Sequence, residues 1–351
     1  MQQQAGSFYN LIREANRVLV LDLGFLGDTI HLIPALRCLR EALPGARLDV
    51  MVAEHIRSIL QLTPWVEGVL GYRRFPKSAP LYRQGHYIRE LRSGRYDAVI
   101  NLNGSDRSSI LTRLSGAPLR LGRRPKRRHW YWPLLFTHRV TVPFGEQPLY
   151  QQRWECLQQA GFPGDAPRFA AEVPAPARAK ASALLEGAEG FFHVSPSTTL
   201  DYKDLPLALQ ADMLNALQRE RGVPLVLSAA PNDRERARLQ ALCEHLDPKP
   251  LRTFAGDLNL VELAAVIERS SLHLGGDSGA LHIAFMLGVP TVSWFRRYAD
   301  MQEWLPSGER HRAVIGVASP QGLQGLTAAD FVTAVQFVLD KPEPGLASLS
   351  Q

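Results

Sequence analysis

The stretch VLVLDLGFLGDTIHLIPALRCLR, residues Val18–Arg40, decides the fold class of this chain. The apolar run Val18–Asp22 is typical of a buried strand, and it ends at a turn that contains Gly24 and Gly27. After the turn, apolar residues recur with helical spacing, which predicts a helix over Thr29–Ala42. A strand, a tight turn and a helix in this order begin an α/β unit.

The turn carries a carboxylate, Asp28, at a point where many α/β proteins bind phosphate. Phosphate is held there by the free amides of the helix N-terminus, and a negative side chain would repel it. The same helix N-terminus stabilises an ionised carboxylate. Two interpretations are open and both can hold: Asp28 caps the helix, which contributes about 1 kcal/mol, or it is a general base that faces a ligand.

Composition predicts a globular protein. The chain has 351 residues, of which 45% are apolar and 21% charged, and its net charge is +6. No apolar run reaches the roughly 18 residues of a membrane-spanning helix, and the first ten residues lack the pattern of a secretory signal. Cys38, Cys156 and Cys243 are scattered without metal-binding spacing, and Cys38 is expected to be reduced and buried. These features predict a cytoplasmic location.

Strand and helix patterns alternate on both sides of residues 161–178, a segment rich in proline, glycine and alanine that we expect to be a linker. Two Rossmann-like domains are therefore expected over residues 1–165 and 166–325, followed by a C-terminal helix and tail over 326–351. Because open α/β sheets bind ligands beyond the carboxyl ends of their strands, the expected active site is a central cleft that the two parallel sheets face.

The expected strands are 18–22, 47–53, 66–71, 96–102, 191–195, 224–229, 251–254, 271–274 and 290–294. The expected helices are 29–42, 82–93, 107–114, 205–217, 233–244, 260–268, 279–286 and 328–339.

A second glycine-rich turn, GGDSGALH at residues 275–282, follows an apolar run and opens an apolar helix. Ser278 is a good N-cap, and glycine lets a ligand approach the backbone. The amides of residues 279–281 would point at a phosphate, and His282 would add a donor on the same face. An ordinary capped turn is the alternative, but the Asp-Ser-Gly-x-x-His grouping at a strand end favours a ligand role.

The loop SPSTTLDYK, residues 195–203, also follows an expected strand. Its hydroxyls and Lys203 are suited to bind a diphosphate. A surface loop rich in serine and threonine is the commoner meaning of such a sequence when it stands alone.

A basic run, RLGRRPKRR at residues 120–128, continues into His129-Trp130-Tyr131-Trp132. Basic residues beside aromatic ones suit an anionic membrane surface or a phosphorylated glycolipid, and also single-stranded nucleic acid. A solvated basic loop is the alternative. No RNP-like motif or zinc-finger spacing is present, so no nucleic-acid partner is expected. The residues of the expected basic surface are Arg123, Arg124, Lys126, Arg127 and Arg128.

Together these stretches resemble the ADP-heptose:lipopolysaccharide heptosyltransferases, glycosyltransferase family 9. The N-terminal family pattern, L-G-D-hydrophobic-hydrophobic-H-x-x-P, is met by residues 26–34 with Thr29 as the one departure. The C-terminal pattern, D-[ST]-G-x-x-H-[LI]-A and then G-x-P-[TV], is met by residues 277–284 and 288–291. The middle pattern, K-x-W-P, is met only in part by residues 203–206.

In that middle pattern, Leu205 stands where tryptophan is usual. The resemblance extends over most of the chain, from about Arg17 to Val314, and it implies a GT-B fold with the nucleotide-sugar in the C-terminal domain and the acceptor on the N-terminal one. It also implies an inverting, metal-independent transfer of heptose from ADP-heptose to a hydroxyl of a lipopolysaccharide core acceptor, either Kdo or heptose.

The resemblance assigns roles to residues. Asp28 would be the general base, while Lys203 and residues 277–282 would hold the diphosphate and the sugar. The expected substrate contacts are Gly27, Thr29, His31, Ser195, Ser197, Thr198, Lys203, Asp277, Ser278, Gly279 and His282. The acidic residue that contacts the nucleotide would be Asp233 or Glu235, with Leu258 against the adenine. No cofactor and no metal is expected.

The expected partners are a nucleotide-sugar donor, an anionic glycolipid acceptor and the inner leaflet of the cytoplasmic membrane. Three alternatives stay open: a heptosyltransferase with a protein acceptor, another GT-B enzyme such as a UDP-sugar epimerase, and an inactive nucleotide-sugar-binding scaffold. Residue spacing does not identify the sugar, the acceptor or the oligomeric state.

Overall fold

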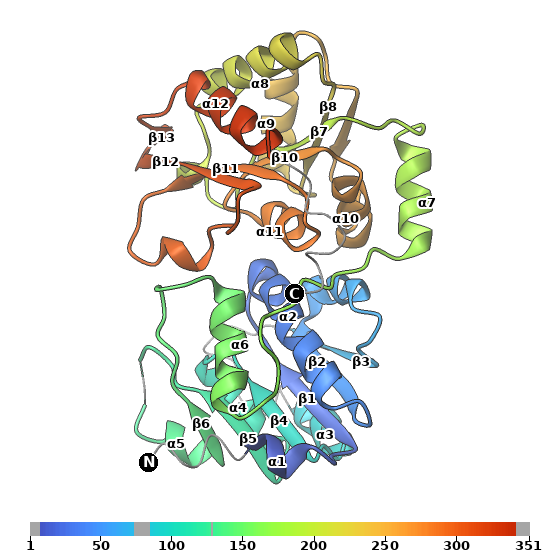
Figure 1. Cartoon of the computed structure of the whole chain (residues 1–351), viewed down its shortest axis with the longest axis vertical. Coiled ribbons are helices and arrows are strands. Elements are labelled where there is room, and N and C mark those ends of the chain that lie inside the picture. Colours follow the sequence, from blue (N-terminus) through green and yellow to red (C-terminus); the bar gives the residue numbers. More distant parts are fainter. Residues whose placement is uncertain (1–7, 74–84, 128, 342–351) are drawn as a thin grey trace. The chain divides into compact units, whose positions relative to one another are not determined.

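The computed structural model describes residues 8–73, 85–127 and 129–341. The chain divides into two compact units, Met1–Ala170 and Ala171–Gln351 (Figure 1). The division falls within the Pro/Gly/Ala-rich segment 161–178, shortly after residue 165. Each unit has its own sheet.

The first unit contains a six-stranded parallel sheet in the order β3-β2-β1-β4-β5-β6. Its strands are β1 Arg17–Leu21, β2 Arg47–Ala53, β3 Gly68–Tyr72, β4 Ala98–Asn101, β5 Leu119–Arg123 and β6 His138–Val140. Its helices are α1 Phe8–Ile12, α2 Leu26–Ala42, the 3₁₀ helix Glu54–Leu62, α3 Gly85–Ser93, α4 Asp106–Leu114, α5 Trp132–Leu135 and α6 Leu149–Gln159.

Strand order reverses between β1 and β4, the two strands from which the chain proceeds in opposite directions across this sheet. Loops beyond the carboxyl ends of such a pair form the usual ligand site of an open α/β sheet. Strands β1, β2 and β4 are mostly apolar and buried, as strands covered on both faces should be.

The second unit contains a seven-stranded sheet in the order β13-β12-β11-β10-β7-β8-β9, parallel except for β13. Its strands are β7 Phe192–Ser195, β8 Leu225–Ala229, β9 Arg252–Ala255, β10 Leu272–Gly276, β11 Thr291–Arg296, β12 His311–Ser319 and β13 Gly322–Gln324. Its helices are α7 Ala175–Leu184, the 3₁₀ helix Asp201–Lys203, α8 Leu207–Arg221, α9 Asp233–Glu244, α10 Leu260–Glu268, α11 Gly279–Met286, the 3₁₀ helix Met301–Glu303 and α12 Ala328–Leu339. Here the order reverses between β7 and β10.

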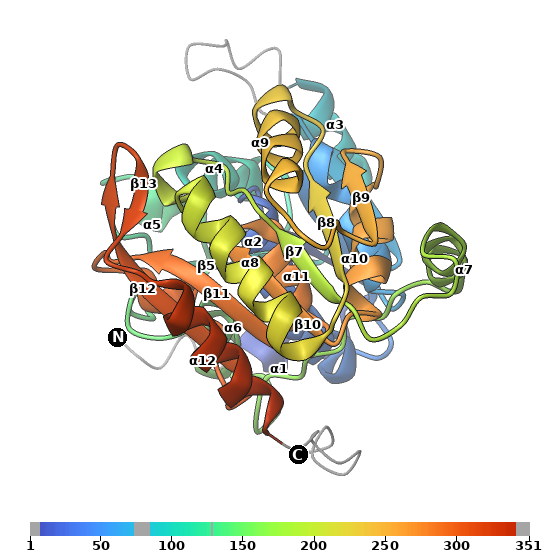
Figure 2. The same ribbon diagram turned by 90° about the horizontal axis from the view of Figure 1, so that it is seen from above.

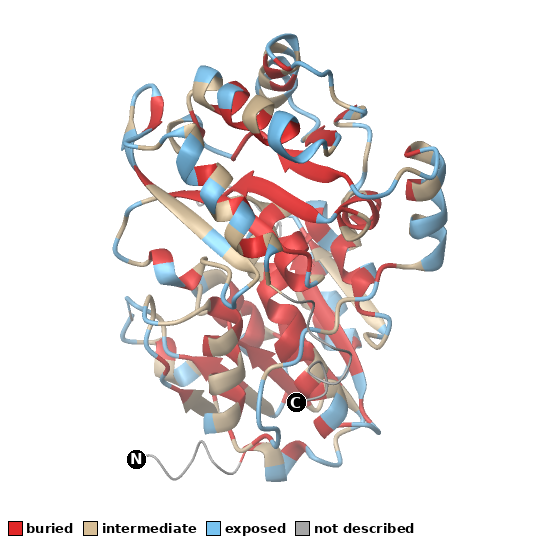
Figure 3. Cartoon of the chain, turned by 45° about the horizontal axis from the view of Figure 1, so that its top comes forward, coloured by how far each residue is buried: buried red, intermediate tan, exposed pale blue. Residues whose placement is uncertain are grey.

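Helices cover both faces of the second sheet. α12 packs against α8, β11 and β12, and both helices lie across the sheet when it is viewed from above (Figure 2). α10 and α11 pack together on the opposite face (Figure 1). Figure 3 shows the result, with the central strands β7, β10 and β11 buried and the outer faces of the helices exposed. The C-terminal helix is thus an integral layer of the second unit.

The structure adds elements that the sequence pattern did not predict, namely β5, β6, β12, β13, α1, α5, α6 and α7. β5 has the sequence LRLGR, in which two arginines obscure the apolar pattern of a strand. α2 begins at Leu26, earlier than expected, because the first helical turn contains the glycine and aspartate that were assigned to the loop. The start of the expected helix 82–93 lies outside the described residues. In the described part of the chain no helix is both long enough and apolar enough to span a membrane.

Candidate functional site

In the first unit, the turn between β1 and α2 is built on a buried carboxylate. Asp22, which directly follows β1, has no solvent exposure. It accepts hydrogen bonds from the Gly24 amide at 2.8 Å and from Nδ2 of Asn103, beyond β4, at 3.2 Å. The loops that follow the two switch-point strands are therefore tied together through Asp22.

Asp28 lies in the first turn of α2 and is 20% exposed. Its Oδ2 accepts a hydrogen bond of 2.8 Å from the amide of Phe25, the N-cap residue. Asp28 therefore satisfies the helix start from inside the first turn and is not itself the N-cap, which corrects the capping expectation. A Cβ at Gly24 would lie 2.3 Å from the Asp28 Cβ, so the close approach of this carboxylate requires glycine.

Arg153 of α6 joins the two carboxylates and was missed by sequence analysis. Its guanidinium is buried and donates to the Asp22 carboxylate and to the Asp28 carbonyl oxygen. Its Nη2 lies 3.8 Å from Asp28 Oδ1. Burial raises the pKa of Asp22; the Arg153 charge opposes this rise, and the Asp28 charge adds to it. No local motif marks Arg153, because its partners are more than a hundred residues away in sequence.

The expected contacts that follow Asp28 are buried. Thr29 and His31 have no solvent exposure, and the His31 ring stacks on Tyr150 with centroids 6.0 Å apart. Both lie on α2, which packs against α6. Both side chains are buried between α2 and α6 and their expected substrate contacts stay predictions, whereas Gly27 is partly exposed.

Arg123 does not belong to a basic surface, which is a second correction. As the last residue of β5 it is buried and donates to the Gln152 side chain and to the carbonyl oxygens of Val142 and Pro143. Its Cζ lies 3.7 Å from the centroid of the Phe144 ring. This arginine therefore supports the packing of α6.

The remaining basic run is exposed where it is described. Arg124, Lys126 and Arg127 are exposed, and Trp130 beside them is 83% exposed. Arg128 lies outside the described residues. The exposed part follows the carboxyl end of β5 and combines positive charge with an aromatic side chain.

In the second unit, the turn after β10 carries an ion pair. Lys203 Nζ lies 2.7 Å from Asp277 Oδ2, and Nε2 of the buried His282 lies 3.7 Å from Asp277 Oδ1. Burial opposes ionisation of Asp277, but its hydrogen bond to His282 and the charges of His282 and Lys203 outweigh burial and lower its pKa. The structure thus brings together three of the predicted residues.

Two buried hydroxyls close to this ion pair make no hydrogen bond with any described residue. Ser278 occupies the N-cap position of α11, yet its hydroxyl does not cap the helix. Ser197, in the loop after β7, is also buried with an unpaired Oγ. Buried polar groups normally have partners, and a helix N-terminus is a ready site for an anion. The two unpaired hydroxyls and the backbone amide of Gly279 at the start of α11 therefore favour a phosphate ligand.

The loop that carries Lys203 is held by Asp204. Asp204 Oδ1 accepts from the Thr198 amide at 2.6 Å and from its hydroxyl at 2.9 Å, and Arg234 Nη1 donates to Oδ2 at 2.8 Å. Arg238 donates to the Pro196 carbonyl oxygen at 3.0 Å. The Thr198 hydroxyl therefore hydrogen-bonds within the loop, and Ser195 is buried at the end of β7. The expected substrate contacts of both residues stay predictions.

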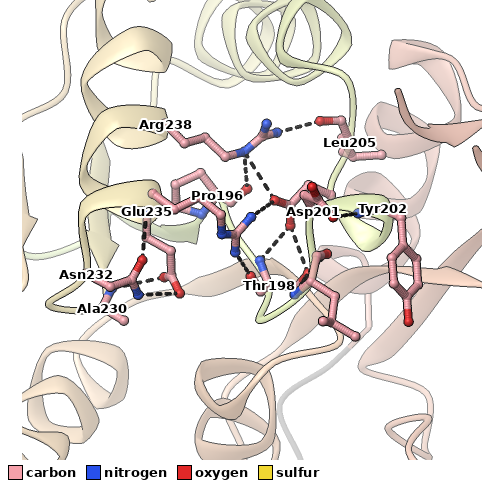
Figure 4. Close-up of polar contacts among 12 residues, drawn as sticks. Pro196, Thr198, Asp201, Tyr202, Leu205, Ala230, Asn232, Glu235 and Arg238 are labelled. Carbon is pink, nitrogen blue, oxygen red and sulfur yellow. Dashed lines mark hydrogen bonds and ion pairs between the residues drawn. The ribbon is translucent and has the colours of Figure 1, made fainter. Parts of the chain in front are cut away.

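Glu235 and Asp233 differ in their surroundings. The Glu235 carboxylate accepts from the Ala230 amide at 3.1 Å and from Asn232 Nδ2 at 3.0 Å, so it holds the start of α9 (Figure 4). The Asp233 side chain is fully exposed and lines a groove of about 560 Å³ beside α9 and β9. Leu258, before α10, is half-buried. Asp233 is thus the more accessible acid of the two.

Arg296 adds a cation that sequence analysis missed. It ends β11, next to β10 in the sheet, and its Cζ lies 5.4 Å and 4.9 Å from the ring centroids of Tyr202 and Tyr298. Its buried Nε makes no hydrogen bond with a described residue. Burial and the charge of Asp277 raise the pKa of Tyr298, so its hydroxyl stays protonated. The doublet Arg296-Arg297 after an apolar strand was the available signal.

Across the described residues, no cluster of three or more His, Cys, Asp or Glu side chains is arranged to hold a metal ion.

The two units define the chain as a GT-B protein, as its likeness to solved structures shows. The glycosyl transferase family 9 structure from Veillonella parvula has a TM-score of 0.81 at 20% identity and covers 92% of this chain and 97% of its own. Escherichia coli heptosyltransferase WaaC, solved with ADP-2-deoxy-2-fluoro heptose, has a TM-score of 0.72 at 22% identity and covers 91% of this chain and 98% of its own.

The sequence profile of glycosyltransferase family 9 (heptosyltransferase) matches residues 85–322. The chain belongs to this family and is a glycosyltransferase. It is 30% identical over 293 residues to lipopolysaccharide heptosyltransferase 1 of Pseudomonas aeruginosa, covering 80% of this chain and 78% of that one.

Proposed function

We propose that this glycosyltransferase transfers heptose from ADP-heptose to a hydroxyl of a lipopolysaccharide core acceptor, Kdo or heptose. The names of its relatives support the substrate class, since one is a lipopolysaccharide heptosyltransferase and another was solved with an ADP-heptose analogue. The observation that carries the proposal is a difference between the two glycine turns. The first presents the carboxylate of Asp28, whereas in the second the Asp277 carboxylate is paired with Lys203 of a neighbouring loop, beside the unpaired hydroxyl of Ser278.

The proposed reaction is a single inverting displacement. Asp28 accepts the proton of the acceptor hydroxyl while the hydroxyl oxygen bonds to the anomeric carbon of the donor. The bond between that carbon and the diphosphate oxygen breaks, and ADP leaves with the electron pair. General-base help of this kind contributes about 10²- to 10⁴-fold.

The donor diphosphate binds in the second unit under this proposal. Lys203 offers a charged donor. Ser278 and the Gly279 amide offer neutral donors at the start of α11, and Ser197 offers one in the loop after β7. Such preorganised donors stabilise charge that develops on the leaving group. Arg296 supplies further positive charge at the same edge of the sheet. The mechanism uses no metal ion and no cofactor.

The exposed part of the basic run would attract an anionic glycolipid acceptor and the inner leaflet of the cytoplasmic membrane; its residues are Arg124, Lys126, Arg127 and Trp130. We therefore place the enzyme on the cytoplasmic face of that membrane. Reversing the three charges to glutamate should weaken binding to vesicles that contain phosphatidylglycerol and should do so most at low salt. Unchanged binding would argue against a membrane role for this surface.

Calorimetric and thermal-shift titrations with ADP, UDP, GDP and ADP-heptose, each with and without EDTA, test the donor. Selective stabilisation by ADP and ADP-heptose that EDTA does not alter is the expected result. A preference for UDP would instead indicate another GT-B activity, and nucleotide binding without transfer to any acceptor would indicate the inactive scaffold. The absence of nucleotide binding would overturn the proposal. Transfer of label from ADP-heptose to protein, and not to core glycolipid, would indicate the protein-acceptor alternative.

A further inference from the structure

A buried cluster of three charged residues lies at the base of the first glycine turn: Asp22 after β1, Asp28 on α2 and Arg153 on α6. We propose that Arg153, anchored by Asp22, is a positioning residue that fixes the Asp28 carboxylate for proton transfer. The inference rests on the proposed function, in which Asp28 is the general base.

Arg153 holds Asp28 from below. The arginine side chain is 1% exposed, and its Nη1 donates to the backbone carbonyl oxygen of Asp28. Its Nη2, which donates to Asp22, lies 3.8 Å from Asp28 Oδ1. One planar guanidinium therefore fixes the backbone of Asp28 and places a positive charge beside its side chain, a geometry that lysine cannot copy with a single ammonium group.

A second contact holds Asp28 from the opposite side. The Phe25 amide donates to Asp28 Oδ2 at 2.8 Å, while Oδ1 is the oxygen that lies near Arg153. Gly24 is in contact with the same side chain and has no room for a Cβ. The two oxygens thus have separate partners, which leaves the carboxylate one orientation at the exposed edge of the turn.

Asp22 anchors the guanidinium. It also accepts from the Gly24 amide and from Asn103 Nδ2, so its position is fixed by β1, by the turn and by the loop after β4. Titratable groups one helical turn from the cluster include Cys156 and Tyr150, on either side of Arg153 in α6, and His31, after Asp28 in α2. Burial raises the pKa of the Cys156 thiol to about 12, so this neighbour stays neutral.

Stability alone is a weak reason for this pair. Desolvating an arginine and a carboxylate costs several kcal/mol, and buried ion pairs are often no more stabilising than apolar residues of similar size. Positioning is a stronger one, because a displacement of about 1 Å at a reacting group can cost about a hundredfold in rate. Arg123 offers a contrast: equally buried against α6, it donates to the neutral side chain of Gln152 and to backbone carbonyl oxygens.

The test compares Arg153→Gln, Arg153→Lys and wild type in initial-rate assays with ADP-heptose and core glycolipid acceptor. Rates are normalised to the sites that bind ADP, which counts folded enzyme. We expect Arg153→Gln to lower kcat about tenfold or more while KM for ADP-heptose changes less than about twofold. Arg153→Lys should recover part of the loss in kcat, because it restores the charge without the two-pronged contact.

Arg123→Gln is the matched control, since it removes an equally buried arginine that donates to the neutral Gln152 side chain and to backbone carbonyl oxygens. It should lower stability and leave the normalised kcat unchanged. Equal losses of kcat in Arg123→Gln and Arg153→Gln would overturn the proposal, because they would show a general packing effect.

If Arg153→Gln does not fold, the variants Arg153→Lys and Asp22→Asn test the positioning role. Asp22→Asn keeps the shape of the side chain and weakens its bond to the Arg153 guanidinium. Normalised kcat at the wild-type level in both would overturn the positioning role, whereas a loss confined to kcat supports it. Asp28→Asn separates this from the proposed function: turnover retained in Asp28→Asn refutes the general base itself, whatever the Arg153 variants do.

Discussion

The two glycine turns share one architecture and differ in the groups that they present at the helix start. In both units a switch-point strand leads through a glycine turn into an apolar helix, α2 in the first and α11 in the second. At the start of α2 the carboxylate of Asp28 already accepts a backbone amide. At the start of α11 the hydroxyl of Ser278 accepts no hydrogen bond from a backbone amide, and the neighbouring Asp277 forms an ion pair with Lys203. A helix N-terminus favours an anion, so the first turn has its anion built in and the second can take one from a ligand.

Neutralising the first turn should have the largest effect. Asp28→Asn is nearly isosteric and removes the base, so we expect kcat to fall about a thousandfold with ADP affinity unchanged within about twofold. Initial rates and calorimetry on the same preparation measure both. Loss of ADP binding together with turnover would instead mean that Asp28 supports the whole fold, and the contrast between the two turns would lose its functional meaning.

Acid should separate the two units in stability. Burial lowers the pKa of His193 to about 3, and lowers the pKa of His273. Below pH 6.5 the unfolded chain binds protons at these imidazoles that the folded chain does not, so stability falls with pH, by about 2–3 kcal/mol at pH 4.5 for His193 alone. The lowered pKa of Asp277 acts in the same direction. The raised pKa of Asp22 acts oppositely, because the folded first unit binds the extra proton.

Hydrogen exchange at pH 7 and pH 4.5 measures this effect. Protection in β7 and β10 should fall more on acidification than protection in β1 and β4. His193→Gln, which removes one of the titrating groups, should reduce the difference. Equal losses in both sheets would contradict the assignment of the buried histidines as the acid-sensitive element.

Removing the lysine of the second turn should weaken donor binding by about 10- to 100-fold, the worth of a charge-assisted hydrogen bond. Lys203→Gln is the variant, and calorimetry with ADP is the measurement. Lys180→Gln is a matched control, since Lys180 also forms a close ion pair in the second unit, with Glu262 at 2.6 Å. Equal affinity in the two variants would exclude Lys203 from the nucleotide site.

Converting the second turn into the first should have the smallest effect. Ser278→Asp places a carboxylate at the N-cap of α11. There it can accept hydrogen bonds from the free backbone amides to which a phosphate would bind. We expect ADP affinity to fall about tenfold, with the melting temperature unchanged or raised. Thr327→Asp makes the same change at the N-cap of α12 and should leave ADP affinity unaltered. Undiminished ADP binding by Ser278→Asp would show that nucleotide does not use this helix start.

Sequence pattern was sufficient for the elements that carry the site. The bounds of α9, α10, α11 and α12 match those expected, because each has an apolar stripe of helical period and a polar residue at its start. The fold class and the glycosyltransferase class were also predicted, and both are confirmed.

The sequence pattern could not predict contacts between segments that are far apart in the chain. The charge run at residues 120–128 conceals the end of strand β5, where alternation turns Arg123 inward. Arg153 lies in a helix without a clear apolar period, and its role depends on Asp22 and Asp28. The roles of individual substrate contacts stay predictions, to be decided by the variants above.

The ion pair between Lys203 and Asp277 has a consequence for product release after each turnover. Under the proposed function, a phosphate that binds Lys203 competes with a carboxylate that already lies 2.7 Å from its Nζ, so donor entry changes the partners of this ammonium group. The exchange runs in reverse when the nucleotide departs, and Asp277 recaptures the ammonium group. An internal competitor of this kind limits how long product is retained, and release of product sets the turnover of many enzymes.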